Sequence, residues 1–361
     1  MRHCNNALHA GAIFLFLFVA AVLSLSAQNT PTQATSGQAP ALTIDRDPVR
    51  SPEGDAPRPR NNPIEKEGNQ FLLRADVEEV SLNATVLDSG GHLVQDLQKD
   101  NFQVFEDGVK QNIISFQHTD LPVSIALVVD NSGSMARKRP AVNKSAVDLV
   151  EASNPQDEAF VVNFSDEAFI DQEFTSDLNK LREGLSHIES RGGTALYDAV
   201  VASADKLAAD AKRPKQVLVI ITDGEDNAST LNLEQTIRRV QQLSGPVIYC
   251  IGLLFGDEMS RSEVRHARRA LEMMSTETGG MAFFPKSIEQ VDQIAAEVAR
   301  DIRSQYTIGY HSTKPSTVPG FRRVQLDAEE SGHGKLVVRT RTGYFPVVRG
   351  QKKTTRAQNQ P

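Results

Sequence analysis

The chain has 361 residues, of which 39% are hydrophobic and 24% are charged, and its net charge is −7. This length accommodates about two domains, and the balance of apolar and charged residues is typical of a globular protein. The negative charge gives no electrostatic support for binding to nucleic acid, so no nucleic-acid partner is expected.

The first 27 residues have the pattern of a secretory signal peptide. Arg2 and His3 precede an unbroken run of apolar and small residues at 10–23, and residues 24–27 offer small side chains for cleavage after Ala27. The run is short for a membrane-spanning helix, which needs about 20 residues. Leu25 is a poor residue three positions before a cleavage point, so an uncleaved anchor stays the alternative. We therefore expect a secreted, periplasmic or cell-envelope protein, with membrane contact only if the signal segment is uncleaved.

The sequence contains two cysteines, and they are not expected to pair. Cys4 lies in the signal segment, and Cys250 lies in the apolar run 247–251. A mature chain without Cys4 has no intrachain disulfide. Cys250 is expected to be a small side chain of the core.

Two segments have the composition of disordered chain. Residues 28–70 carry seven of the 17 prolines, with many Gln, Ser and Thr and no periodic apolar pattern, which predicts a disordered linker. Residues 348–361 form a basic tail with Arg349, Lys352, Lys353 and Arg356, which is also expected to be disordered.

The two flanks of the chain carry strand patterns. Residues 71–118 contain alternating apolar and polar side chains, interrupted by turn signals at 88–91 and 106–108, and predict strands at 80–87, 102–105 and 109–116. Residues 305–347 predict three more, at 305–310, 322–326 and 336–341. Neither flank has enough strands to bury a core alone. We expect the two flanks to form one β-sandwich-like domain, with the central part of the chain inserted between them.

Residues 119–304 alternate between strand and helix patterns. Strands are expected at 123–129, 159–164, 216–221, 247–253 and 281–284. Helices are expected at 141–152, 178–188, 195–211, 233–243, 262–276 and 288–303. Several of the strands are nearly continuous apolar runs, as in parallel strands that are covered on both faces. The fold class is therefore α/β, with a doubly wound, mainly parallel sheet.

Oxygen-bearing side chains follow the expected core strands of this central part. Asp130, Ser132 and Ser134 follow the strand 123–129, and Asp223 follows the strand 216–221. Thr194 comes after two glycines, directly before a helix. In open α/β sheets ligands bind beyond the carboxyl ends of the strands. An oxygen-only set of side chains suits a hard divalent cation, so we expect Mg²⁺ or Mn²⁺ at these five residues.

At these residues the sequence resembles the von Willebrand factor type A domain, over about residues 121–303. In that family a metal-ion-dependent adhesion site is built from an Asp-x-Ser-x-Ser loop, a distant Thr and a distant Asp. Asp130, Ser132 and Ser134 match the loop, Thr194 matches the Thr, and Asp223 matches the second Asp. The flanking strands resemble those of bacterial secreted proteins that carry such a domain.

The resemblance implies a role for each residue. The Ser and Thr hydroxyls would coordinate the ion directly or through water, and Asp130 and Asp223 would act at least partly through bridging waters. One coordination position would stay open for an Asp or Glu of a protein partner. Near the site, Asp198 either supports the metal ligands or lies on a helix surface. Glu225 and Asp226 are expected to be solvated loop carboxylates, and a role at the rim of the site in the choice of partner is the alternative.

The expected function is therefore a non-enzymatic binding or adhesion module. An enzyme is disfavoured because the sequence has no Gly-x-Ser-x-Gly elbow around Ser132 or Ser134, no His-Glu-x-x-His motif and no Walker-type phosphate loop. A hydrolase is the remote alternative. An envelope scaffold protein with a vestigial metal site is the other alternative.

Overall fold

The computed structural model describes residues 79–346, apart from 188–189, 244 and 257–258, together with the strand segments 42–44, 47–49, 66–67 and 70–71. The predicted signal peptide and the predicted tail lie outside the described residues. Within the described part of the chain, no helix combines the length and the apolar character that crossing a membrane requires.

A mainly parallel sheet forms the centre of the fold. Its strands run in the order β14-β13-β12-β9-β10-β11-β1-β2. The parallel strands are β9 (Val123–Asp130), β10 (Glu158–Phe164), β12 (Lys215–Thr222), β13 (Val247–Gly252) and β14 (Ala282–Phe283). Nearly every residue of β9, β10, β12 and β13 is buried, because helices cover both faces. The predicted doubly wound α/β fold is thus confirmed.

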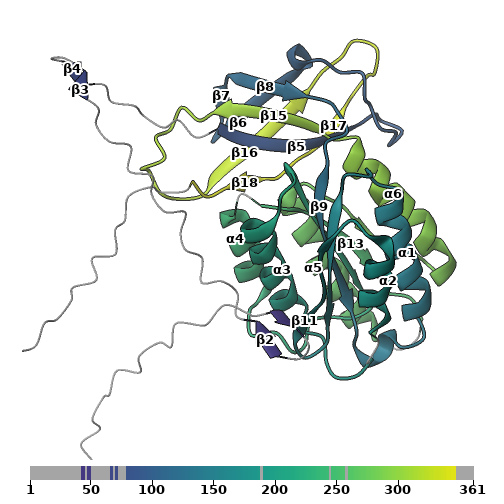
Figure 1. Cartoon of the computed structure of the whole chain (residues 1–361). Coiled ribbons are helices and arrows are strands. Elements are labelled where there is room, and N and C mark those ends of the chain that lie inside the picture. The colour runs from purple at the N-terminus through teal and green to yellow at the C-terminus, as the bar shows by residue number, and fades with distance from the viewer. Residues whose placement is uncertain are drawn as a thin grey trace, which may run out of the picture. The chain divides into compact units, whose positions relative to one another are not determined.

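The helices divide between the two faces of this sheet. On one face α1 (Arg139–Glu151), α2 (Leu178–Ser186) and α6 (Val291–Arg303) share a core with the sheet. A 3₁₀ turn at Ile288–Gln290 precedes α6. On the other face lie α3 (Leu196–Asp210), α4 (Leu233–Gln242) and α5 (Arg261–Thr278). Figure 1 shows α1 and α2 on one side of β9, and α3 and α4 on the other.

The edge of the sheet beyond β10 differs from the sequence prediction. Strand β11 (Ala168–Thr175) was not predicted, and it runs antiparallel to β10. Next to it lie β1 (Leu42–Ile44) and β2 (Asp47–Val49), inside the segment predicted to be a disordered linker. A separate pair of strands, β3 (Lys66–Glu67) and β4 (Gln70–Phe71), also lies in the predicted linker 28–70, except for Phe71. Edge strands are held mainly by backbone hydrogen bonds, so they need no apolar run that composition would reveal.

Strands from both flanks of the chain form two further sheets. One has the order β17-β5-β15-β8 and the other β18-β16-β6-β7. Strand β15 (Tyr306–His311) comes from the C-terminal flank and pairs on its two sides with β5 (Glu79–Leu87) and β8 (Ile113–Gln117). The remaining strands are β6 (Phe102–Glu106), β7 (Val109–Gln111), β16 (Arg322–Ala328), β17 (Val337–Arg339) and β18 (Gly343–Tyr344). A 3₁₀ turn at Lys99–Asn101 leads into β6.

The two sheets share one apolar core, which includes Leu82, Val104, Tyr306 and Leu326. The strand predicted at 109–116 is wrong as a single element, because β7 and β8 lie in different sheets. Alternating side chains indicate extended chain but do not report where the chain changes its partner. The exact division of the chain into domains stays a proposal.

Buried polar contacts link the α/β part to the β part. The carboxylate of Asp301 in α6 accepts from the Tyr249 hydroxyl at 2.5 Å and from the Arg339 guanidinium at 2.6 Å. Gly279 ends α5 with a φ of 87°, and a side-chain carbon there would lie 2.7 Å from the backbone of Thr340 and Arg341. Glycine at this position therefore allows the segment between β17 and β18 to pass close to the end of α5.

Candidate metal-binding site

The five predicted site residues lie at the point where the sheet changes its direction of winding. Strand β9 lies between β10 and β12, with Asp130 opposite Phe164 on one side and Val129 opposite Ile221 on the other. The chain leaves β9 through α1 to reach β10, and β12 pairs with the opposite edge of β9. This is the topological switch point at which open α/β sheets bind ligands.

Asp130 is the last residue of β9, so its prediction as a loop residue is off by one position. Its side chain is fully buried. One carboxylate oxygen accepts from the backbone N–H of Ser132 at 2.8 Å, and the other accepts from the Thr222 hydroxyl at 2.6 Å. Burial raises the pKa of Asp130 to about 6, against the opposite effect of these hydrogen bonds from Thr222 and Ser132. The strand end thus holds a carboxylate whose ionised form is disfavoured.

The two serines connect Asp130 to Asp223. A 3₁₀ turn at Gly133–Met135 carries Ser134 and brings its hydroxyl to 3.2 Å from that of Ser132. The Ser134 hydroxyl donates to Oδ1 of Asp223 at 2.7 Å. Oδ2 of Asp223 lies 2.5 Å from Nζ of Lys138, and the Asp223 side chain is fully buried. A continuous row of hydrogen bonds therefore joins Asp130, Ser132, Ser134 and Asp223.

Thr194 reaches the same place from the loop before α3. Its backbone N–H donates to the side-chain oxygen of Asn227 at 2.9 Å, and its carbonyl accepts from the Asn227 N–H at 3.1 Å. The Thr194 hydroxyl lies beside Gly224, at 3.5 Å from where a side-chain carbon of that residue would be. Ser134, Thr194 and Asp223 line one cavity of about 250 Å³. The structure therefore brings all five predicted residues to one edge of the sheet.

Sequence reasoning missed several residues that hold this arrangement. Thr222 and Asn227 fix Asp130 and Thr194 through the hydrogen bonds above, and Lys138 contacts Asp223 directly. In addition, the carboxylate of Asp166 accepts from the backbone of Gly193 at 2.7 Å. The only sequence signal for Lys138 is its position four residues after Ser134, at the start of α1. The others are distant in sequence from their partners and give no local signal.

A buried arginine lies behind the site. Arg139 is fully buried, and its guanidinium donates to the side-chain oxygen of Asn163 at 2.8 Å and to the carbonyl of Leu185 at 3.1 Å. Burial lowers the pKa of Arg139 to about 10, although Asp130 and Asp171 act in the opposite direction. Its positive charge therefore partly balances the buried carboxylate of Asp130.

The neighbouring acids have structural contacts. Asp198 accepts from the backbone N–H groups of Thr230 at 2.8 Å and Leu231 at 3.0 Å, so it fixes that loop at the start of α3. The expectation that Asp226 is solvated is wrong: it is half-buried and accepts from the N–H of Tyr197 at 3.1 Å. The Asp226 carboxylate thus accepts a hydrogen bond at the N-terminus of α3, where a negative charge is favoured. Glu225 lies 3.4 Å from the ring of His266.

The chemistry of this donor set fits a hard divalent cation. Every predicted ligand is an oxygen on a short side chain, and only two of the five are carboxylates. Among the described residues no group of three or more His, Cys, Asp and Glu side chains is placed to hold a metal. The Lys138 ammonium shows that a positive charge is accommodated beside Asp223.

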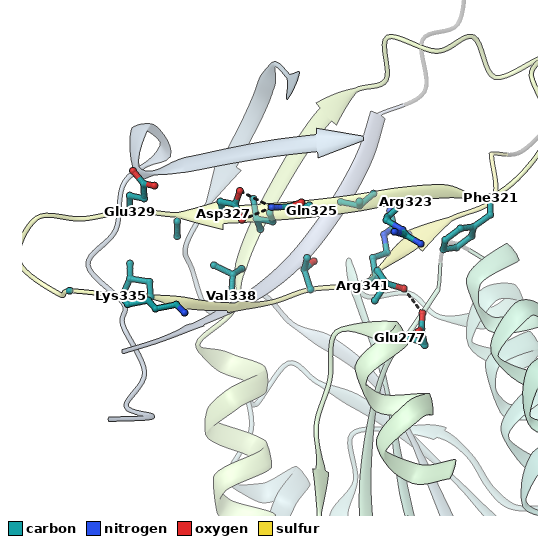
Figure 2. Close-up of a pocket in the computed structure, with 16 residues that line it drawn as sticks. Glu277, Phe321, Arg323, Gln325, Asp327, Glu329, Lys335, Val338 and Arg341 are labelled. Atoms are coloured by element: carbon teal, nitrogen blue, oxygen red, sulfur yellow. Dashed lines mark hydrogen bonds between the residues drawn. The ribbon is translucent and has the colours of Figure 1, made fainter. Parts of the chain in front are cut away.

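Another cavity lies elsewhere, along β16 and β17 in the β part. It has a volume of about 950 Å³ and is lined by side chains of both charges, among them Arg323, Asp327, Glu329, Lys335 and Arg341. Figure 2 shows these labelled side chains spread along two strand segments, without a common centre. They form no convergent set of ligands comparable to the row at the end of β9.

Comparison with known proteins identifies the central part of the chain. Residues 125–225 match the family model of the von Willebrand factor type A domain. This match confirms, over residues 125–225, the family resemblance predicted from the sequence. No curated protein matches the chain.

The matches among solved structures include three proteins of different origin. A von Willebrand factor type A protein from Catenulispora acidiphila has 13% identity and a TM-score of 0.43, with 69% of this chain and 74% of that chain covered. The von Willebrand factor domain of the type V pili tip protein Mfa5 from Porphyromonas gingivalis has 13% identity and a TM-score of 0.40, with 51% and 95% covered. Proximal thread matrix protein 1 from the mussel byssus, with a zinc-occupied MIDAS motif, has 19% identity and a TM-score of 0.42, with 55% and 50% covered.

Proposed function

We propose that this chain is a binding module that captures a protein partner through a divalent cation, Mg²⁺ or Mn²⁺. The ion would be held by the five residues that meet at the end of β9, namely Asp130, Ser132, Ser134, Thr194 and Asp223. The observation that carries the proposal is the hydrogen-bonded row from Asp130 to Asp223 at the switch point, with Thr194 in the same cavity as Ser134 and Asp223.

The charge balance of the site supports capture of an acidic group. Two carboxylates contribute to the site, and both are already engaged by hydrogen bonds from neighbouring groups. A divalent cation with hydroxyl and water ligands keeps a strong attraction for another anion. An Asp or Glu side chain of a partner protein would supply that anion and complete the coordination.

A binding module accounts for the serines better than an enzyme does. A nucleophilic serine needs an adjacent base that is free to take its proton. The Ser134 hydroxyl donates to Asp223, but the other oxygen of that carboxylate is already paired with Lys138, so Asp223 is not free to act as that base. The Ser132 hydroxyl lies beside that of Ser134. We place the protein outside the cytoplasm, in the cell envelope or secreted, because of the signal-like pattern in residues 1–27.

Chelation separates this proposal from a scaffold with a vestigial site. The full chain is immobilised, envelope proteins are captured with Mg²⁺, and each captured protein is then purified and titrated against the chain by surface binding. Binding should vanish in chelator, return with Mg²⁺, and fail for Asp223→Ala. It should persist for Asp100→Ala, which removes an exposed carboxylate in the β part.

The partner should also lose binding when its contacting Asp or Glu is changed to the amide. Binding that is undiminished in chelator would contradict the cation-bridge mechanism and leave the scaffold alternative. Calorimetric titration with Mg²⁺ and Mn²⁺ measures the ion directly. Equal heats for the wild type and Asp223→Ala would contradict the assignment of the site.

A further inference from the structure

We propose that Lys138 is a built-in cation that competes with the divalent ion and lowers its affinity for the site. The inference rests on the proposed function, because it concerns the same five residues. It assigns a role to a residue that lies outside that ligand set. The observation that motivates it is the 2.5 Å contact between Nζ of Lys138 and Oδ2 of Asp223.

The contact is buried and specific, unlike an ordinary surface ion pair. The Asp223 side chain is fully buried, and only 15% of the Lys138 side chain is exposed. The ammonium also lies 5.5 Å from the ring centroid of Phe255, which lines the same cavity. Exposed ion pairs contribute little to stability, whereas separating a desolvated pair has a substantial free-energy cost.

The position of Lys138 in the chain gives a second argument. It is the N-cap residue of α1 and makes no side-chain capping hydrogen bond. The N-terminus of a helix carries a partial positive charge, so a lysine there is locally unfavourable. The contact with Asp223 offsets that local disadvantage. In addition, this contact is made with one of the two carboxylates that the ion requires.

An ion and the ammonium cannot both take full advantage of the Asp223 carboxylate. The bound ion and the Lys138 ammonium would both lie next to the Asp223 carboxylate, and repulsion between two such close positive charges is strong in a buried site. Binding of the ion therefore requires the ammonium to withdraw from Asp223. Glu225 and Glu263 line the same cavity and offer carboxylates toward which the flexible lysine side chain can turn. The cost of this withdrawal lowers the apparent affinity of the site for the ion.

Neutral substitutions at position 138 test the inference on the full chain. Lys138→Met removes the charge and keeps the length of the side chain. Arg137→Met is the matched control, since it removes one positive charge from the exposed neighbouring position. Mn²⁺ affinity is measured by calorimetry and by electron paramagnetic resonance of free Mn²⁺, at fixed pH and ionic strength. Lys138→Met should bind Mn²⁺ at least tenfold more tightly than the wild type, and Arg137→Met should differ by less than threefold.

Thermal unfolding gives a readout that a merely structural ion pair would not reproduce. In chelator Lys138→Met should melt below Arg137→Met, because Asp223 has lost its partner. With saturating Mn²⁺ its melting temperature should rise by more than that of the wild type. Lys138→Gln should show the same pattern of affinity if the methionine variant does not fold. Lys138→Arg keeps a charge and should keep affinity close to that of the wild type.

The outcomes separate this inference from the proposed function. Mn²⁺ affinities that are equal in the wild type, Lys138→Met and Lys138→Gln would overturn the role of Lys138 and leave the proposed cation site intact. Weaker binding by the neutral variants would also overturn it. Binding by the neutral variants alone would support the inference and contradict a cation bridge in the wild type. If no variant binds Mn²⁺, both proposals fail.

Discussion

Replacement of Asp130 by asparagine should make the metal-free protein more stable while abolishing its affinity for divalent cations. The Asp130 carboxylate is fully buried at the end of β9, and burial raises its pKa from 3.8 to about 6. A pKa difference of one corresponds to about 1.4 kcal/mol, so at pH 7 the ionised carboxylate costs the fold about 3 kcal/mol. Asparagine removes this cost because it carries no charge.

The hydrogen bonds around Asp130 allow the substitution. The amide oxygen of asparagine can accept from the Ser132 N–H as the carboxylate does, and the amide nitrogen can donate to the Thr222 hydroxyl. Neutral hydrogen bonds are weaker than charge-assisted ones by about 1 kcal/mol. The net gain is therefore about 1–2 kcal/mol, which corresponds to roughly 2–8 °C in melting temperature for a domain of this size.

The sign of the pH dependence follows from the same pKa. Because the folded-state pKa lies above the unfolded value, the folded protein holds the Asp130 proton more tightly. The contribution of Asp130 to the stability of the wild type therefore falls as the pH rises from about 4 to about 6, and Asp130→Asn lacks this contribution. The difference between the two proteins should therefore grow across that window and stay constant above it.

Calorimetric melting in chelator and in Mg²⁺ provides the assay, with Asp223→Asn as the comparison. That variant should melt below the wild type in chelator, because Lys138 loses the carboxylate at 2.5 Å. Opposite effects at two carboxylates of one site would identify Asp130 as a residue kept for binding at the expense of stability. The reasoning is refuted if Asp130→Asn melts below the wild type in chelator. It is also refuted if Mg²⁺ raises the melting temperatures of the wild type and Asp130→Asn equally.

Three further predictions concern the fold. Burial lowers the pKa of Lys215 from 10.5 to about 8. Between these pH values the unfolded chain binds one more proton at Lys215 than the folded protein does, so the free energy of unfolding should rise with pH from about 8 to 10. Urea titrations at each pH should show a smaller rise for Lys215→Met. Asp301→Ala should lower the free energy of unfolding by about 3 kcal/mol, since Arg339 loses its buried partner, and the Asp301→Asn control should lose less. Residues 119–304 should fold alone while residues 71–118 should give a poorly dispersed NMR spectrum; good dispersion from that flank would contradict its dependence on strands such as β15.

The central α/β fold could be predicted from sequence because burial on both faces leaves a strong local signal. Runs such as Val123–Asp130 are apolar almost throughout, and most of the core strands are followed by a helix pattern of ordinary length. The sequence pattern of strand β11 was weaker because most of its residues are only partly buried, so it is not a continuous apolar run. The break between β7 and β8 gave none, since it depends on which sheet each half joins.

The predicted ligands were visible in the sequence because each comes directly after a core strand or a glycine pair. Three of them occupy five consecutive positions, so strand β9 alone delivers Asp130, Ser132 and Ser134 to one edge. The residues that hold these ligands could not be predicted in the same way. Thr222 contacts Asp130 only because β12 lies beside β9 in the sheet, and Asn227 reaches Thr194 only after the chain has folded.

The balance of charge at the site is a property of the folded protein alone. In the sequence, Arg137, Lys138 and Arg139 are a short basic run at the start of a helix, and nothing distinguishes their roles. In the structure they separate: Arg137 is exposed, Arg139 is buried behind Asp130, and Lys138 contacts Asp223. Each of the two site carboxylates thus has its own positive charge nearby, one fixed in the core and one on a flexible side chain. Only the flexible one can withdraw, so the affinity for a divalent cation should be controlled at Asp223, and Lys138 is the residue at which it can be adjusted without changing a ligand.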